Sequence, residues 1–239
     1  MVGADLCHII IRPMEFSEEL YEYIEAHISA EPEGLHRLER LSHLRMVHGR
    51  MCSGHWQGRL LKMLTEMIRP RRVLELGTFT GYATLCMAEG LAACADSGLG
   101  HADAVIDTIE IFDENEDFLR DVFSRFPEGK RVNLIIGAAL EIMPALPQGE
   151  YDFIFIDADK RLYPEYLALS KQLLSAGGYM IADNTLWDGH VVNPARNDAQ
   201  TRGVKRFNDL VAADPDLETV IIPLRDGLTL IRKTPPRNQ

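Results

Sequence analysis

The feature that most constrains the fold of this chain is an alternation of strand-like and helix-like segments that begins near residue 73. Five short apolar runs have the length and composition of buried strands: residues 72–77, 104–112, 132–137, 151–157 and 178–183. Segments with apolar residues three and four positions apart separate most of them, and one helical segment, residues 165–178, ends in two glycines. Repeated alternation of this kind predicts right-handed βαβ units, and hence an α/β fold with a buried parallel sheet and helices on both faces.

Segments on either side of this pattern complete the predicted fold. Three runs with helical spacing come before it: residues 17–28, 34–47 and 58–68. Two β-rich runs follow it and flank Asp226-Gly227, a pair typical of a tight hairpin, so the last strand should be antiparallel. We therefore predict a single domain, 1–239, with an N-terminal helical cap over residues 1–70 and an α/β core over residues 71–239.

Composition narrows the classes of function. The 239 residues carry a formal net charge of -11 and contain no Lys/Arg-rich block, so nucleic acid is not an expected partner. The first residues lack the basic start and the long apolar run of a signal peptide, and no segment has the apolar length of a membrane span. The four cysteines form no CxxC pair, which favours a reducing compartment. We expect a cytoplasmic protein with no membrane partner.

A glycine turn follows the first predicted strand, in "LELGTFTGYAT". Three residues separate Gly77 from Gly81, so the turn is not the GxGxxG fingerprint, but it still lets a ligand approach the backbone and the helix N-terminus. A plain turn without a ligand is equally compatible. Glu75 within the strand needs partners, either a cationic ligand or backbone amides, because a lone buried carboxylate is costly.

Glu110 ends the second predicted strand, where a carboxylate typically accepts hydrogen bonds from ribose hydroxyls. An ordinary solvated acid is the alternative, and the glycine turn upstream favours the ribose interpretation. The two features together indicate an adenosine-type cofactor. They leave NAD and S-adenosylmethionine both open.

Polar residues also end the fourth and fifth predicted strands. Asp157 follows "FIFI", and Asp183 with Asn184 follows "GYMIA". If these strands are neighbours, two carboxylates and an amide oxygen meet, a hard ligand set suited to Mg²⁺, Mn²⁺ or Ca²⁺. A capping role at a strand end would explain any one of these residues. All three together, beside Lys160, favour a metal site.

The segments "VLELGTFTGYAT", "FIFIDADK" and "IADNTLWDG" resemble the motifs of the class I, metal-dependent O-methyltransferases. These are the catechol and caffeoyl-CoA O-methyltransferases and their bacterial relatives, and the similarity spans roughly residues 45–233. The resemblance implies a Rossmann-like, seven-stranded sheet that is mostly parallel with an antiparallel last strand. It also implies S-adenosylmethionine as the methyl donor, Mg²⁺ as the usual metal, and a homodimer, since relatives are usually dimers.

The resemblance assigns roles to individual residues. Asp157, Asp183 and Asn184 match the metal ligands, and Lys160 matches the candidate general base, so that Lys160 and Asp157 are the catalytic pair. We also place Trp187 and Asp188 at the border of the substrate site, in the loop that follows the metal ligands. A buried structural role would also explain Trp187, and Asp188 departs from many relatives, which have Asn or Gly there. The matched cofactor residues are Met51, Ser53, Glu75, Gly77, Thr78, Phe79, Ala83, Glu110, Ala139, Asp157 and Asp159.

The implied reaction is methyl transfer to one hydroxyl of a small vicinal-dihydroxy aromatic acceptor. A phenol has a pKa near 10, so a dication chelated by both hydroxyls would serve as Lewis acid and template. Lys160 would then remove the remaining proton if burial and the dication lower its pKa. A salt bridge to Asp157 or Asp159 is the alternative for Lys160. We expect Tyr163 and Tyr166 to be packing residues.

Two other functions are compatible with parts of the sequence. A nicotinamide-dependent dehydrogenase would use the same sheet, but the absent GxGxxG and the antiparallel last strand argue against it. A cofactor-binding regulatory protein without turnover is the second alternative. The intact set of Asp157, Lys160, Asp183 and Asn184 argues against that function.

Overall fold

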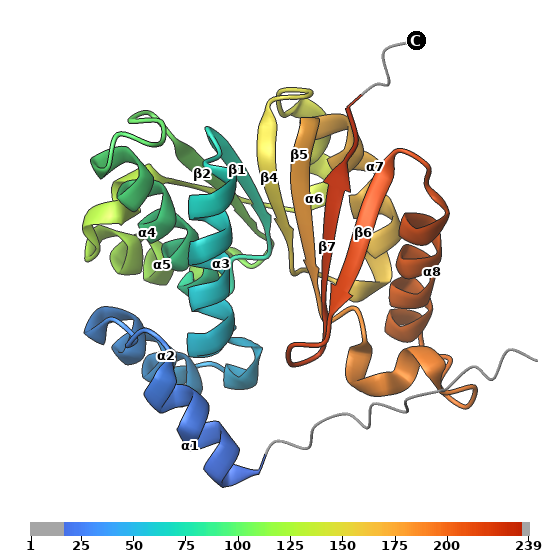
Figure 1. Ribbon diagram of the computed structural model, residues 1–239, viewed down its shortest axis with the longest axis horizontal. Helices are drawn as coiled ribbons and strands as arrows, with labels where there is room; N and C mark the ends of the chain where they lie inside the picture. The colour runs from blue at the N-terminus through green and yellow to red at the C-terminus, as the bar shows by residue number, and fades with distance from the viewer. Residues whose placement is uncertain (1–16, 236–239) are drawn as a thin grey trace, which may run out of the picture.

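The computed structural model describes residues 17–235 and confirms the predicted order of helices and strands (Figure 1). Ser17 caps the first helix by accepting the N–H of Leu20 at 3.3 Å. The helical spacing predicted before the first strand is confirmed, whereas residues 1–16 of the predicted cap lie outside the described residues. The helices of this section are α1 (Glu18–His27), α2 (Glu33–Arg45) and α3 (Gly54–Ile68).

Seven strands form one sheet in the order β3-β2-β1-β4-β5-β7-β6. Strands β1 to β5 pair in parallel, and β7 runs antiparallel to both β5 and β6. The Rossmann-like sheet with an antiparallel last strand is therefore confirmed. The strands are β1 (Arg72–Leu76), β2 (Val105–Glu110), β3 (Val132–Ile136), β4 (Tyr151–Ile156), β5 (Leu174–Asp183), β6 (Leu217–Ile222) and β7 (Leu228–Lys233).

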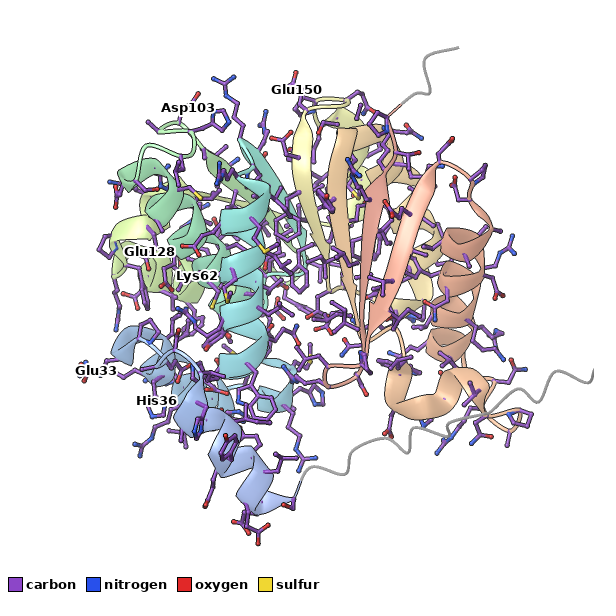
Figure 2. The ribbon with its side chains drawn as sticks, in the orientation of Figure 1. Glu33, His36, Lys62, Asp103, Glu128 and Glu150 are labelled. Atoms are coloured by element: carbon purple, nitrogen blue, oxygen red, sulfur yellow. The ribbon has the colours of Figure 1, made fainter. Side chains whose placement is uncertain are left out.

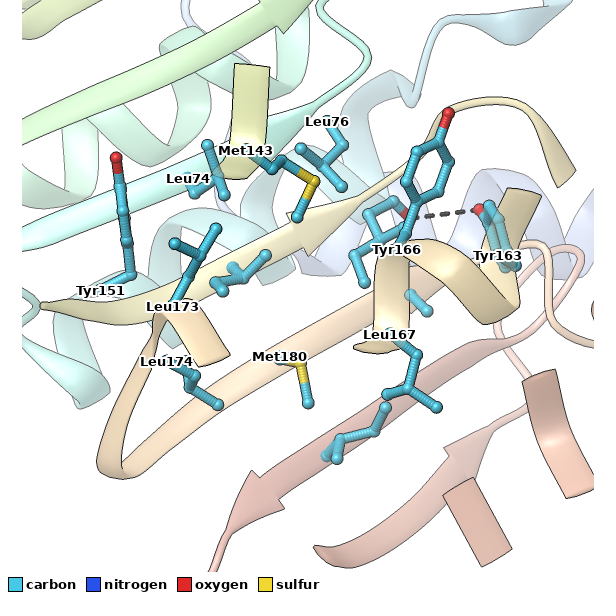
Figure 3. Close-up of a cluster of buried hydrophobic side chains, with 14 of the residues drawn as sticks. Leu74, Leu76, Met143, Tyr151, Tyr163, Tyr166, Leu167, Leu173, Leu174 and Met180 are labelled. Atoms are coloured by element: carbon cyan, nitrogen blue, oxygen red, sulfur yellow. Dashed lines mark hydrogen bonds between the residues drawn. The ribbon is translucent and has the colours of Figure 1, made fainter. Parts of the chain in front are cut away.

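Helices cover both faces of the sheet because alternate strand residues point to opposite sides. Leu74 and Ile154 pack in one cluster with residues of α7 (Tyr163–Leu173) and α8 (Ala199–Ala213). Figure 3 shows Leu74 and the α7 side chains of this cluster. Val73 and Phe153 point the other way and pack with α3 and α4. The helices of the core are α4 (Tyr82–Asp96), α5 (Glu116–Ser124), α6 (Ala139–Ile142), α7 (Tyr163–Leu173) and α8 (Ala199–Ala213).

One predicted boundary is wrong. The helix predicted to end at Gly177-Gly178 ends at Leu173, and β5 begins at the next residue. The pairing of β4 with β5 shifts register between Tyr151 and Phe153, and Gly177 has a φ of +81°. Glycine adopts that left-handed conformation without steric cost, so Gly177 permits an irregular start of β5, and neither glycine ends the helix.

The surface of the protein is rich in charged side chains, as the composition predicts. Charged side chains lie over the outer surface, as Figure 2 shows for Asp103, Glu128 and Glu150, and the net charge is -11. Among the described helices, none has the length and apolar character needed to cross a membrane.

Candidate active site

The carboxyl ends of β1, β4 and β5 meet at one edge of the sheet. The register of β4 and β5 pairs Ile156 with Ala182, so Asp157 and Asp183 follow at neighbouring strand ends. The N–H of Asp157 donates to the carbonyl of Leu76 at 2.9 Å and holds this residue against the end of β1. Ligands bind at such a switch point, because the strand order reverses there.

A cleft lies at the end of β1. Gly77 shapes it, since its φ is +94° and a Cβ at this position would lie 2.1 Å from the carbonyl oxygen of Asp157. Only glycine allows the turn after β1 to approach β4 this closely. The cleft gathers seven of the predicted cofactor residues with three others, in the set Met51, Cys52, Ser53, Gly77, Thr78, Phe79, Thr80, Tyr82, Ala83 and Asp157.

Glu75 lies fully buried near this cleft. One carboxylate oxygen, Oε2, accepts hydrogen bonds from the hydroxyls of Thr84 and Thr108, the latter at 2.6 Å. The other oxygen, Oε1, is buried and has no hydrogen-bond partner within the described residues. Burial raises the pKa of Glu75 to about 8, against the opposing effect of the two threonines. A buried oxygen of this kind is an acceptor that a cationic or hydrogen-bonding ligand would satisfy.

Glu110 is a buried acid that fixes the turn beside the cleft, not the solvated acid of the alternative interpretation. Its two oxygens accept the N–H of Phe79 at 2.8 Å and the N–H of Phe112 at 3.0 Å. Phe79 has a φ of 52°, an unusual conformation for a residue with a side chain, and the bond to Glu110 supports it. Glu110 therefore positions the segment that follows β1.

Lys160 and Asp157 form a nearly buried ion pair. The Lys160 ammonium donates to Asp157 Oδ1 at 2.7 Å and to the Tyr163 hydroxyl at 2.7 Å. The Tyr163 hydroxyl also lies 2.8 Å from the carbonyl oxygen of Asp183, and its ring packs in the core cluster (Figure 3). The salt bridge foreseen as an alternative for Lys160 is confirmed. Tyr163 is more than the packing residue predicted.

The pKa of Lys160 departs from the expected direction. Burial lowers it, but the negative charge of Asp157, with smaller effects of Tyr163 and Asp183, outweighs burial and raises the pKa above its ordinary value. Burial alone therefore does not lower the pKa of Lys160, because the carboxylate of Asp157 lies within hydrogen-bond distance. The lowering expected from burial and a dication together stays a prediction.

Asp183 is 4% exposed and is held on both oxygens. Gln57 donates to Oδ2 at 2.7 Å, and the N–H of Asn184 donates to Oδ1 at 2.7 Å. Burial, and then the charge of Asp157, raises the pKa of Asp183 to about 6. Asn184 has a φ of 58°, which asparagine tolerates better than most residues. Two carboxylates and an amide at adjacent strand ends suit a hard divalent cation.

Four further predicted residues lie outside the cleft lining and make no hydrogen bond with the carboxylates described above. Ala139 begins α6 and packs at the margin of the core. Asp159 accepts the N–H and the guanidinium of Arg161, at 3.0 and 2.9 Å, and this partner lowers the pKa of Asp159. Trp187 is half-buried in the turn after β5, and the side chain of Asp188 is 88% exposed. No role of these four follows from their contacts alone.

The structure adds residues that the sequence interpretation missed. Gln57 reaches Asp183 from α3, and the two threonines Thr84 and Thr108 hold Glu75. A signal was present for Gln57: with Leu61 and Thr65 it lies at four-residue spacing on the buried face of α3. A fully buried polar side chain on such a face requires a polar partner.

Comparison with known proteins identifies the family. A sequence model of the O-methyltransferase family matches residues 25–234. The chain belongs to this family. The caffeoyl-CoA O-methyltransferase of Eucalyptus gunnii is 33% identical to this O-methyltransferase over 231 residues, which cover 91% of this chain and 88% of that protein.

Solved structures agree with the family. The O-methyltransferase TomG from Streptomyces achromogenes, involved in tomaymycin synthesis and solved in complex with SAM, has a TM-score of 0.80 at 27% identity and covers 90% of this chain and 96% of its own. The SAH-bound methyltransferase PaMTH1 of Podospora anserina also has a TM-score of 0.80 at 27% identity, with 92% and 98% covered. The resemblance to S-adenosylmethionine-dependent O-methyltransferases is confirmed, which favours this activity over the dehydrogenase alternative.

Proposed function

We propose that this O-methyltransferase transfers the methyl group of S-adenosylmethionine to one hydroxyl of a small vicinal-dihydroxy aromatic acceptor, with a divalent cation, preferably Mg²⁺, held by Asp157, Asp183 and Asn184. The observation that carries the proposal is the convergence of two buried or half-buried carboxylates and Lys160 at adjacent strand ends, next to the cleft. The similarity to caffeoyl-CoA O-methyltransferases supports the choice of acceptor.

The cofactor side of the proposal rests on the cleft after β1. Its lining would hold the cofactor, and the unpartnered Oε1 of Glu75 marks a nearby position where a hydrogen-bond donor or positive charge is favourable. The narrow turn at Gly77 allows close approach to the backbone. Glu110, fixed by two amides, keeps the neighbouring turn in place for a ribose.

The acceptor side rests on Asp157, Lys160 and Tyr163. Bound Mg²⁺ would supply Lewis acidity to the acceptor hydroxyls. With a dication held nearby, its positive charge would lower the pKa of the Lys160 amine, and Nζ would take up the proton released by the substrate hydroxyl. The Tyr163 hydroxyl keeps Nζ directed at this position. The predicted homodimer, single-domain organisation and cytoplasmic location stay predictions.

Methyl transfer from labelled S-adenosylmethionine to a panel of catechols, with Mg²⁺ and then with EDTA, tests the proposal. We expect transfer that depends on the cation and on adjacent hydroxyls, so that a monophenol of similar size reacts poorly. Equal activity in EDTA would contradict the metal site. Cofactor binding without transfer to any catechol would instead support the regulatory alternative or a different acceptor.

A further inference from the structure

Arg225 lies in the loop between β6 and β7, far along the chain from α3, yet its side chain contacts the start of that helix. Its guanidinium donates to the carbonyl of Ser53 and, at 3.1 Å, to the carbonyl of Cys52; the carbonyl of Arg50 lies 3.5 Å away. The segment that carries these carbonyls forms one wall of the cofactor cleft through Met51 and Ser53. One cation therefore holds this wall in place.

Arg225 makes these contacts from a strained backbone conformation. Its φ is 52°, in the left-handed region that costs energy for any residue with a Cβ. Glycine would adopt this conformation freely. An arginine here places a charged, multidentate donor against three backbone carbonyls.

Arg225 also lies beside Gln57, which reaches the proposed metal site. Arg225 Nη1 is 3.5 Å from Gln57 Oε1, and Gln57 Nε2 donates to Asp183 Oδ2 at 2.7 Å. Because a guanidinium has no acceptor, the amide oxygen of Gln57 must face Arg225. The amide nitrogen then faces Asp183, so the orientation of a fully buried amide is fixed from both ends.

We propose that Gln57 and Arg225 are positioning residues of this O-methyltransferase. Gln57 sets the orientation of the Asp183 carboxylate, while Arg225 holds both the Gln57 amide and the Arg50–Ser53 wall of the cofactor cleft. The inference rests on the proposed function, since it assigns Asp183 to a cation and the cleft to the cofactor. Arg225 links the two halves of the site, because loss of its guanidinium would disturb both the cofactor cleft and, through Gln57, the proposed metal site.

Three variants test this inference: Arg225→Gly, Gln57→Leu and the matched control Arg69→Gly. Arg69 ends α3 with a φ of 55° and is exposed, so its replacement relieves the same backbone strain away from the site. The affinities of the full-length protein for S-adenosylhomocysteine and for Mn²⁺ are measured by calorimetry, each ligand separately. Steady-state kcat and KM for both substrates are measured alongside.

We expect Gln57→Leu to weaken Mn²⁺ binding at least tenfold, the usual effect of removing a hydrogen-bond partner of a metal ligand, while S-adenosylhomocysteine binding stays near wild type. Arg225→Gly should weaken S-adenosylhomocysteine binding about tenfold, the scale of one charge-assisted hydrogen bond, and Mn²⁺ binding by less than Gln57→Leu does. Arg69→Gly should change neither affinity. If Gln57→Leu fails to fold, Gln57→Met replaces it, because a flexible side chain of similar length fills the same space.

The outcomes separate this inference from the proposed function. Arg225→Gly with the same affinities as Arg69→Gly would overturn the role of Arg225, and full Mn²⁺ affinity in Gln57→Leu would overturn the role of Gln57. Wild-type protein that binds S-adenosylhomocysteine but no Mn²⁺ would overturn the proposed metal site and, with it, the Gln57 half of the inference. The Arg225 half would then be decided by S-adenosylhomocysteine affinity alone.

Discussion

The two halves of the site hold their carboxylates in different ways. At the ends of β1 and β2, Glu75 and Glu110 are held by neutral donors, namely threonine hydroxyls and backbone amides. At the end of β4, Asp157 pairs with the ammonium of Lys160, and at the end of β5 the amide of Gln57 holds Asp183. Among these contacts, no positively charged side chain touches the carboxylates of the first half, whereas Lys160 touches Asp157 in the second half.

This difference indicates what each half is prepared to bind. Neutral donors do not compensate the negative charge of a buried carboxylate, which is why the pKa of Glu75 is raised to about 8. A ligand that brings positive charge beside Glu75 would stabilise its ionised form. A sulfonium cofactor brings such a charge. In the other half Asp157 already pairs with Lys160, so a cation held there as proposed would alter the protonation of the amine. The first half is thus suited to bind a positively charged ligand, and the second half to take up or release a proton at Lys160.

The largest expected effect comes from removing Asp183. Asp183→Ala should lower kcat/KM for a catechol by at least about 1,000-fold, because the proposed cation would lose a ligand and its Lewis acidity is worth several kcal/mol. Asp209→Ala, which removes an exposed carboxylate on α8, is the matched control and should keep wild-type activity. Activity is measured over a range of Mg²⁺ concentrations. If Asp183→Ala keeps its activity and that activity does not respond to EDTA, the second half holds no catalytic cation, and the proposed difference between the two halves is wrong.

The next effect concerns Lys160. Lys160→Met should lower kcat about 100-fold or more, the contribution typical of a general base, while Mn²⁺ binding stays equal or becomes tighter because Asp157 loses its internal partner. Lys171→Met removes a lysine that pairs with Asp214 on the outside of the core, and its kcat should not change. Unchanged kcat in Lys160→Met would assign the lysine a purely structural role.

A smaller effect is expected at Glu75. Glu75→Gln should weaken S-adenosylmethionine binding about tenfold, because the neutral amide cannot compensate the positive charge of the cofactor. Calorimetry at pH 8 measures this directly. Binding as tight as wild type would mean that Glu75 only supports the turn and that the charge argument for this half fails.

Glu75 also predicts a pH dependence of stability. Its pKa is raised to about 8 in the folded protein, so the folded state holds a proton that the unfolded state releases near pH 4.5. The contribution of Glu75 to stability is therefore full below about pH 4.5 and is lost as the pH rises towards 8. Urea unfolding at pH 5.5 and pH 8 should show a loss of a few kcal/mol in wild type that Glu75→Gln lacks. Glu165→Gln, an exposed acid on α7, should follow wild type.

The sequence predicts the sheet and the strand ends well because both depend on local pattern. Apolar runs locate β1 to β5, and polar residues that follow them, such as Asp157 and Asp183, must lie at the edge where the strands end. The start of β5 was missed because it depends on register with β4, and register is a property of the pair.

Contacts across long stretches of chain could not be predicted from the sequence. Gln57 is 126 positions from Asp183, and Arg225 is 172 from Ser53, so no local pattern joins either pair. The Asp226-Gly227 pair correctly predicts a hairpin, but not that the preceding arginine reaches α3. Such contacts can be predicted only when the packing of α3 against the sheet is known.

The smallest expected effect on activity is that of Tyr163, whose hydroxyl bonds to Lys160 in the second half of the site. Tyr163→Phe removes only the hydroxyl that accepts from Lys160 and lies 2.8 Å from the carbonyl of Asp183, so the free energy of unfolding should fall by about 1 kcal/mol and kcat by severalfold. An oxygen that accepts from an ammonium favours the charged amine, so its loss should lower the pKa of Lys160 and shift the acid limb of the kcat profile to lower pH. Tyr166→Phe, in the same helix and core cluster, should leave that limb in place. If both variants give the same pH profile, Tyr163 acts through packing alone, and Asp157 rather than the Tyr163 hydroxyl determines the pKa of Lys160.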